Sequence, residues 1–307
     1  MEDGIREVLR FYKDQLYINE VNGFSVTLLN SGQNHHIYLA DAGNKQFIFR
    51  ISFREELEAS LKKEFDTLKT IPANLGPEAY IFDDSKKLIP KAFMIQSFIK
   101  GQHVEKFSNA FLATHARKMA DLHSKNVINQ KPKSAYESFF ERYDYSKKNQ
   151  PELFENDLSI DQIATKIETL FSHNEGIFKN INNSYLIHGD LHHRNILLDG
   201  ETIKYVDWEE ARYGDNALDV ATLLWFIELS PEQYGTYLTT YQEIIQDPSL
   251  EKRMNLWLIY KDFSLLLHMK WVALEPETRS ISKTEDFNSS IKKIIDKLEA
   301  RISLFTV

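Results

Sequence analysis

The stretch from His188 to Leu198 reads HGDLHHRNILL, and DWE follows at positions 207–209. It places an aspartate, an asparagine and a second aspartate in fixed order, at positions 190, 195 and 207. Phosphoryl transfer uses these residue types: one carboxylate orients and deprotonates a hydroxyl, while the asparagine and the other carboxylate hold Mg²⁺ on the nucleotide phosphates. Magnesium prefers hard oxygen ligands and keeps several waters, so a few side-chain oxygens suffice.

The flanking residues predict how these three side chains come together. Residues 185–187 are apolar and predict a short buried strand, and residues 195–198 and 203–206 predict a hairpin around the turn at Asp199-Gly200. A hairpin brings its two ends together, so the three polar side chains are expected at one spot. The competing interpretation is a surface hairpin that carries ordinary turn carboxylates.

This pattern resembles the catalytic loop and magnesium motif of the aminoglycoside phosphotransferase family, which also contains choline, ethanolamine, homoserine, fructosamine and methylthioribose kinases. Gly189-Asp190 stands where protein kinases carry Arg-Asp, and Asp207-Trp208-Glu209 replaces their Asp-Phe-Gly. The resemblance covers nearly the whole chain. It implies a catalytic Asp190, magnesium ligands Asn195 and Asp207, and ATP or GTP with Mg²⁺ as cofactors.

The resemblance also implies an α+β, bilobal protein-kinase-like fold. Residues 1–98 would form a small antiparallel-sheet lobe that binds the nucleotide, and residues 99–307 a larger, mostly helical lobe with the catalytic loop and substrate-binding helices. Apolar spacing predicts a helix near residues 5–16. Alternating or apolar runs predict strands at 24–29, 37–40 and 46–51, an antiparallel meander.

Polar residues fill the first turn of this meander. Ser31, Gly32 and Asn34 stand where kinases cover the nucleotide phosphates with backbone amides, although a full Gly-x-Gly-x-x-Gly is missing. A glycine in a hairpin is also an ordinary turn residue, so only the downstream motif favours the nucleotide-binding interpretation. The pairs His35-His36 and His192-His193 do not predict zinc, because adjacent side chains diverge and no further ligands follow at metal spacing.

Arg50 ends the third predicted strand, where a kinase carries its phosphate-binding lysine. Arginine stays charged and offers a planar fork that suits phosphate oxygens. Lys45 is the competitor, but it lies in the turn before the strand. Glu64, beside the apolar stripe of the helix near 61–68, is the expected ion-pair partner of Arg50, with Glu58 as the alternative.

Residues 78–82 and 92–98 predict the last two strands of the small lobe. The segment after them resembles the interlobe hinge of the family, which implies that backbone groups of Ser97, Phe98 and Ile99 bind an adenine edge. Gln96 would lie near the inner end of the nucleotide pocket.

The remaining chain is expected to be mainly helical. His123, after the helix predicted at 107–122, is interpreted as a buried structural histidine, and Asp215 can cap a helix. Residues 130–180 contain no clear motif, and in the family this region shapes the substrate pocket. Candidates for the acceptor wall are three aromatic residues and a carboxylate, a set that suits an ammonium group but is also typical of a core: Trp257, Tyr260, Asp262 and Trp271.

Composition bounds the class of protein. The 307 residues are 42% hydrophobic and 27% charged, as in globular proteins, and cysteine is absent, which excludes disulfides and thiolate metal sites. The net charge of −8 argues against a nucleic-acid partner and favours a cationic small molecule. No apolar run approaches a membrane span and no signal peptide is indicated, so a cytoplasmic protein without a membrane partner is expected.

Together these features predict a small-molecule kinase that transfers the γ-phosphoryl group of ATP or GTP to a hydroxyl of a small cationic acceptor, such as an aminoglycoside or amino alcohol. Two alternatives remain. One is a regulatory nucleotide-binding module without activity, against which the intact polar triad argues. The other is a protein kinase, against which Gly189 and the lack of an Ala-Pro-Glu element argue. The motifs leave the acceptor and the oligomeric state open.

Overall fold

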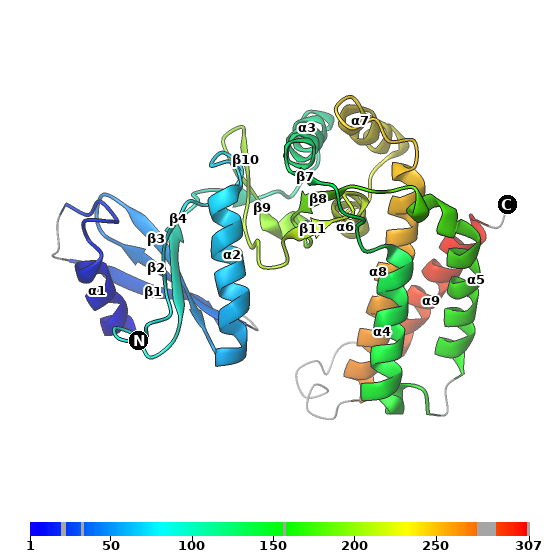
Figure 1. Ribbon diagram of the computed structural model, residues 1–307, viewed down its shortest axis with the longest axis horizontal. Coiled ribbons are helices and arrows are strands. Elements are labelled where there is room, and N and C mark those ends of the chain that lie inside the picture. Colours follow the sequence, from blue (N-terminus) through cyan, green and yellow to red (C-terminus); the bar gives the residue numbers. More distant parts are fainter. Residues whose placement is uncertain (20–22, 32–33, 156–157, 275–286, 306–307) are drawn as a thin grey trace. The chain divides into compact units, whose positions relative to one another are not determined.

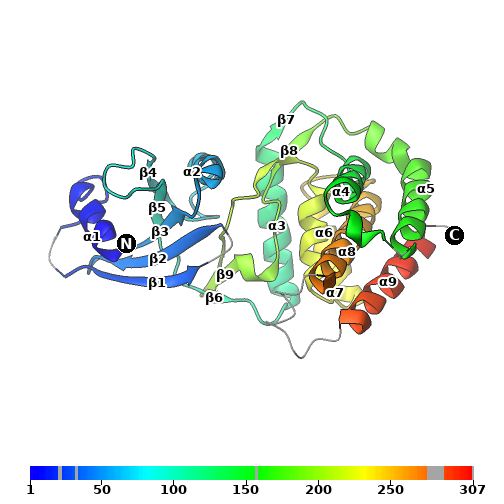
Figure 2. The ribbon, with the colours of Figure 1, turned by 90° about the horizontal axis from the view of Figure 1, so that it is seen from below.

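The computed structural model describes residues 1–19, 23–31, 34–155, 158–274 and 287–305. The chain forms two compact units, and each is discontinuous in sequence. The first unit comprises residues 1–122 and 188–211, and the second comprises residues 123–187 and 212–307. Figures 1 and 2 show the elements of both units.

A five-stranded antiparallel sheet dominates the first unit, in the order β1-β2-β3-β5-β4 (Figure 1). The predicted meander is present, and the last two strands enter in reverse order because β5 pairs with β3 while β4 lies at the edge. The strands are β1 Ser25–Ser31, β2 His35–Asp41, β3 Gln46–Ser52, β4 Ala79–Asp83 and β5 Phe93–Ser97.

The two faces of this sheet carry different residues. On one face, alternate residues of β3 and β5, such as Phe47, Phe49 and Ile95, are buried in a core with Ile5 and Leu9 of α1 (Glu2–Phe11). Side chains alternate along a strand, so the residues between them point to the other face. The register places Arg50 opposite Met94, and Gln96 opposite Ile48, on that second face.

The helix α2 (Glu58–Thr70) contacts β3, β4 and β5, and buries Leu61, Glu64 and Leu68. Residues 71–77 then run to the second sheet of the unit, where the Tyr205 N–H donates to the carbonyl of Leu75 at 2.6 Å. This sheet has the order β10-β9-β6, and its members are β6 Gln102–His103, β9 Ile196–Asp199 and β10 Thr202–Tyr205. The predicted hairpin is therefore present, and Gly200 turns it with a φ of 60°.

The second unit is mainly helical (Figure 2). The long α8 (Leu250–Leu274) contacts α4, α5, α6 and α9 and supplies more buried apolar residues than any other helix that the structure describes. A small sheet in the order β11-β8-β7 completes this unit. Its other elements are β7 Val127–Ile128, α4 Ala135–Asn149, α5 Ser159–Lys179, β8 Ser184–Ile187, β11 Arg212–Gly214, α6 Ala217–Phe226, α7 Pro231–Gln242 and α9 Phe287–Ser303.

The helix α3 (Asn109–Lys125) carries the chain from the first unit into the second. Among the described residues, every helix is too short or too polar to span a bilayer. The expected division after residue 98 stays a prediction.

Candidate functional site

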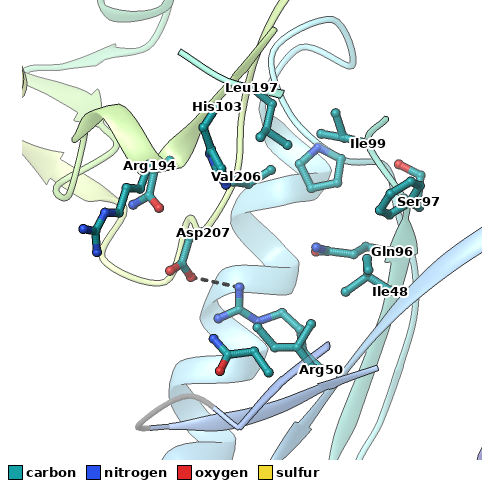
Figure 3. Close-up of a pocket in the computed structure, with 15 residues that line it drawn as sticks. Ile48, Arg50, Gln96, Ser97, Ile99, His103, Arg194, Leu197, Val206 and Asp207 are labelled. Atoms are coloured by element: carbon teal, nitrogen blue, oxygen red, sulfur yellow. Dashed lines mark hydrogen bonds and ion pairs between the residues drawn. The ribbon is translucent and has the colours of Figure 1, made fainter. Parts of the chain in front are cut away.

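The first unit contains a cavity of about 310 Å³ between the second face of its large sheet and the β9–β10 hairpin (Figure 3). Asp207 lies on one side of it, paired with Arg50, and Gln96 lies next to Ile48 on the other side. Aliphatic side chains from the sheet and from the hairpin, together with polar residues at both ends, form its lining. The lining includes Ile37, Ile48, Arg50, Gln96, Ser97, Phe98, Ile99, Arg194, Asn195, Leu197, Val206 and Asp207.

At its inner end the cavity is bordered by the end of β5. The N–H groups of Ser97 and Phe98 donate to the carbonyls of Glu78 (2.8 Å) and Gln46 (3.2 Å), so this backbone is fixed to two neighbouring segments. Gln96 is only 5% exposed, and its amide oxygen accepts no hydrogen bond from any residue that the structure describes. The backbone is therefore held in place, while the buried amide is left for a ligand.

Arg50 is surrounded by carboxylates. Its Nη1 lies 3.0 Å from Glu64 Oε1 and 2.9 Å from Asp207 Oδ1, and its Nη2 lies 3.4 Å from Glu209 Oε2. Glu58, the alternative partner, instead pairs with Lys86 at 3.4 Å. Arg50 thus joins the sheet, α2 and the segment after β10.

The charges of this cluster shift one another. Burial alone would lower the pKa of Arg50, but Glu64 and Asp207 raise it above its ordinary value. Burial raises the pKa of Glu64 to about 7, against the opposing effect of Arg50. The pKa of Glu209 is raised by burial and by the nearby Asp207. Three carboxylates around one guanidinium leave an excess of negative charge, which favours binding of a cation.

Glu209 and His35 belong to this cluster and were not predicted from the sequence, whereas Asn34 was. The Asn34 side-chain amide donates to Glu209 Oε1 at 3.4 Å, and His35 Nδ1 lies 3.6 Å from Glu209 Oε2. His35 is 2% exposed, and burial together with Arg50 lowers its pKa to about 4, so it is neutral at pH 7. The spacing in the sequence could have indicated His35. It stands two residues before Ile37 on β2, so both side chains point to the face of the strand that borders the cavity.

The loop that follows β8 is shaped by Gly189, whose φ of 84° is a left-handed conformation that glycine adopts without strain. The buried His188 donates from Nε2 to the Val206 carbonyl (3.0 Å), and its ring lies 4.6 Å from the Trp208 ring. Asn195 donates from its side-chain nitrogen to the Asp190 carbonyl at 2.9 Å and lies 3.5 Å from Asp190 Oδ2. Asp190 and Asn195 are thus direct neighbours.

Asp207 follows the return strand and is brought to the loop by the hairpin. The Val206 N–H donates to the Asn195 carbonyl at 3.0 Å, which ties the two segments together. Asp207 has a φ of 66°, an unusual conformation for a residue with a side chain. Its carboxylate is 40% exposed and remains accessible.

The structure therefore brings Arg50, Glu64, Gln96, Asn195 and Asp207 together in one unit. Ser97, Phe98 and Ile99 line the same cavity. Asn34 lies at the Glu209 side of the cluster, and Ser31 is the last residue of β1. Gly32 lies outside the described residues.

His123 and Asp215, which were expected to have structural roles, lie in the second unit. His123 is fully buried, with Nδ1 2.6 Å from the Tyr241 hydroxyl and Nε2 3.2 Å from Asp219. Asp215 accepts from the Ala217 N–H (3.0 Å), the Trp257 indole (2.7 Å) and Arg253.

Two candidates for the acceptor wall are buried in the core of the second unit. Trp257 is bonded to Asp215, and Asp262 binds the Trp225 indole at 2.6 Å and pairs with Arg301 at 2.7 Å. Both are at most 3% exposed. Tyr260 and Trp271 are only partly buried. Of the four candidates, these two are the ones whose side chains reach the surface of the unit.

Comparison with known proteins places the chain in a family. The model of the phosphotransferase enzyme family (APH) matches residues 25–256, and the chain belongs to that family. It is thus a phosphotransferase by class, as the sequence predicted. No curated protein sequence matches it significantly.

Solved structures share its fold at low identity. A choline kinase from Cryptosporidium parvum Iowa II is 13% identical, with a TM-score of 0.69 over 98% of this chain and 95% of that one. The choline kinase LicA from Streptococcus pneumoniae is 16% identical, with a TM-score of 0.62 over 97% and 99%. The GDP complex of aminoglycoside 2′-phosphotransferase-IIIa is 14% identical, with a TM-score of 0.65 over 96% and 98%. The expected α+β, protein-kinase-like fold class is thereby confirmed.

Proposed function

We propose that this phosphotransferase transfers the γ-phosphoryl group of ATP or GTP to a hydroxyl group of a small cationic acceptor, such as an aminoglycoside or an amino alcohol. One observation carries the proposal: Arg50, Asn195 and Asp207 line the same cavity as residues 97–99. That cavity has a buried amide and fixed backbone at one end, for a base, and a charged cluster at the other, for phosphates. Similar proteins solved with GDP and with AMP are consistent with a nucleotide in it.

Arg50 is the phosphate-binding residue in this proposal. Its guanidinium carries several donors in one plane, and the pair with Glu64 fixes its direction. Glu64 is almost completely buried, so it acts through Arg50 and does not itself meet the nucleotide. In this proposal Ser31 and Asn34 complete the phosphate end of the site.

Asp190 is the proposed catalytic base. A carboxylate within hydrogen-bond reach of the acceptor hydroxyl orients it and takes its proton as the oxygen attacks the γ-phosphorus. The Asn195 side chain donates a hydrogen bond to the backbone carbonyl of Asp190 and also approaches the Asp190 carboxylate. These contacts limit the orientations of the Asp190 side chain. His188 stabilises the loop by donating a hydrogen bond to the carbonyl of Val206.

Asn195 and Asp207 are the proposed magnesium ligands, and the residues present fit that ion. Asn195 uses its amide nitrogen toward Asp190, which leaves its oxygen for a metal, and one oxygen of Asp207 is not used by Arg50. In the described part of the chain, acidic and histidine side chains nowhere gather in threes as a metal site of their own. Magnesium is usually bound by one or two carboxylates together with phosphates and water, and it would neutralise the charge of the phosphate oxygens.

The carboxylates around Arg50 and the acidic composition of this part of the sequence support the proposal of a cationic acceptor. Between His188 and Asp219 the sequence contains eight acidic residues against Arg194, Lys204 and Arg212. Arg194 lines the cavity and so balances part of that charge. The proposal includes a cytoplasmic setting, where ATP and GTP are supplied.

A turnover screen tests the proposal. Purified protein with Mg²⁺ and ATP or GTP is offered aminoglycosides, choline, ethanolamine, homoserine, methylthioribose and amino sugars, and nucleotide diphosphate release is coupled to a signal. One strong acceptor supports the proposal and defines the acceptor class. Nucleotide binding without any accepted alcohol would favour the regulatory module, and phosphorylation of a peptide library would favour a protein kinase.

The variant Asp190→Asn tests the assigned base. It keeps the size and the neighbours of the side chain but cannot accept the proton, so we expect kcat to fall by about 10²- to 10⁴-fold while nucleotide binding persists. Asp199→Asn is the matched control, because Asp199 is an exposed residue at the end of β9. Activity that survives in Asp190→Asn would remove Asp190 from the mechanism.

A further inference from the structure

Gln96 carries a feature that nucleotide phosphates do not explain. It is 95% shielded from solvent, it lines the cavity, and its amide oxygen is buried without a hydrogen bond from any described residue. Buried polar groups in folded proteins are nearly always bonded, and leaving one unpaired is unfavourable. An amide that is unbonded and directed into a cavity is therefore suited to a ligand that supplies its partner.

The walls beside Gln96 define the shape of that ligand. Ile37 and Ile48 come from the sheet, and Leu197 and Val206 come from the hairpin. Figure 3 shows Gln96 next to Ile48, across the cavity from Asp207. Aliphatic side chains on both sides favour a flat apolar ring, with its polar edge toward Gln96.

The hydrogen-bonding pattern of glutamine distinguishes the purines. Its amide offers one acceptor next to a donor. Adenine presents the complementary pair, a donor at N6 beside an acceptor at N7, whereas guanine presents two acceptors, O6 and N7. Glutamine can therefore form two hydrogen bonds with adenine along this edge and only one with guanine. The second hydrogen of N6 stays available for the backbone of residues 97–99.

We propose that Gln96 is the specificity-determining residue for the nucleotide, and that it selects adenine over guanine by accepting from N6 and donating to N7. This inference rests on the proposed function, since it assumes that the cavity binds the base of the phosphoryl donor. It narrows that function to ATP. Gln96 acts on binding of the base and takes no part in the chemical step.

Equilibrium binding of diphosphates tests this without an acceptor. The full-length chain is titrated calorimetrically, in the presence of Mg²⁺, with ADP, GDP and 7-deaza-ADP, which lacks the N7 acceptor. The wild-type protein should bind ADP about tenfold or more tightly than GDP, because a lost hydrogen bond that leaves a buried partner unpaired has an effect of this size. It should also bind 7-deaza-ADP more weakly than ADP.

The variant Gln96→Met separates base reading from a structural role. Methionine has a similar length but no amide, so the preference for ADP over GDP should fall toward equality, and ADP and 7-deaza-ADP should bind alike. Gln130→Met is the matched control, because Gln130 is exposed and does not line the cavity. Its nucleotide preferences should equal those of the wild-type protein.

The outcomes distinguish the two proposals. Wild-type protein that binds ADP and GDP equally well would overturn the role of Gln96 while the nucleotide site stands. A Gln96→Met variant that loses affinity for all three ligands by the same factor would also overturn it, since that is the result of a structural defect. Wild-type protein that binds none of the ligands would overturn the proposed function as well. The 7-deaza comparison on wild-type protein needs no variant and holds even if Gln96→Met does not fold.

Discussion

Arg50 shows at the scale of one residue how the site is held before any ligand arrives. A buried guanidinium needs partners, and three carboxylates from two different segments supply them. Glu64 was predicted from its place beside the apolar stripe of α2, because a helix position fixes the direction of its side chain. Glu209 and His35 were not, since their approach depends on how the hairpin meets the sheet, which no local pattern encodes.

The neutral His35 makes stability depend on pH in a defined window. Its pKa is about 4 in the folded protein and about 6.5 in the unfolded chain. As pH falls from 6.5 to 4, the unfolded chain therefore takes up a proton that the folded protein does not, and stability is lost. Between pH 7 and 4.5, we expect the free energy of unfolding to fall by about 2 kcal/mol less for His35→Gln than for the wild-type protein.

Denaturant titrations at a series of pH values measure this difference. Glu64 changes stability in the opposite direction, because its raised pKa lets the folded protein take up a proton first as pH falls. It is present in both proteins, so the difference between them isolates His35. His173→Gln is the control, since His173 is exposed on α5. Parallel pH profiles for wild-type and His35→Gln proteins would contradict the argument.

Among the elements, the connection from α2 to β4 passes very close to the β9–β10 hairpin. A Cβ on Gly76 would lie 2.6 Å from Ile71 Cδ1, 3.0 Å from Trp208 Nε1 and 3.4 Å from the Tyr205 carbonyl oxygen. Trp208 cannot retreat, because it is fully buried between His188 and Tyr205 and its indole donates to the Tyr205 carbonyl at 3.0 Å. A side chain here would have to displace the Ile71 methyl group and press against Trp208, so glycine fits this position best.

We expect Gly76→Ala to destabilise the protein by about 1–3 kcal/mol through this overpacking. Because Trp208 lies next to Asp207, phosphoryl transfer should also weaken. Gly176→Ala is the matched control: Gly176 lies within α5, its added Cβ would meet nothing within 4 Å, and alanine should stabilise the helix by about 0.5–1 kcal/mol. Thermal unfolding of the wild-type protein and the two variants tests this prediction. Equal shifts of the melting temperature for both variants would contradict the close approach at Gly76.

The sequence predicted long elements better than short ones. The third strand was expected at 46–51 and spans Gln46–Ser52, because its alternation is long enough to read. The strands β6, β7 and β11 have only two or three residues, which is too short for a pattern of alternating side chains. They form because each pairs with a neighbouring strand, and the sequence alone does not reveal that pairing. The start of α4 can be recognised in the sequence from a Ser-x-x-Glu pattern, and Ser134 and Glu137 of this pattern form a capping box in the structure.

At the scale of the whole molecule, the chain order and the compact units differ. Residues 188–211 belong to the same unit as the N-terminal sheet, although 65 residues of the other unit, 123–187, precede them. The polar triad was predicted to converge because a hairpin joins it. Only the family resemblance predicted that this triad lies beside Arg50, because contacts between distant segments leave no periodic signal in one sequence.

Net charge is the property of the whole molecule that bears on the acceptor. With 37 basic and 45 acidic residues, the protein attracts cations over a distance that salt shortens to about 8 Å at physiological ionic strength. For a cationic acceptor found by the screen, we therefore expect kcat/KM to fall by about two- to fivefold as NaCl rises from about 50 to 300 mM. The loss should appear in KM, because salt weakens encounter and binding and leaves the chemical step unchanged.

A neutral acceptor provides the control for this electrostatic argument. An alcohol of the same shape in which carbon replaces the ammonium nitrogen should react more slowly, but its kcat/KM should hardly change with salt. MgATP must be saturating throughout, because its own binding also depends on ionic strength. An equal salt dependence for the charged and the neutral acceptor would show that the nucleotide site or the protein itself responds to salt. The acidic surface would then have no part in selecting the acceptor.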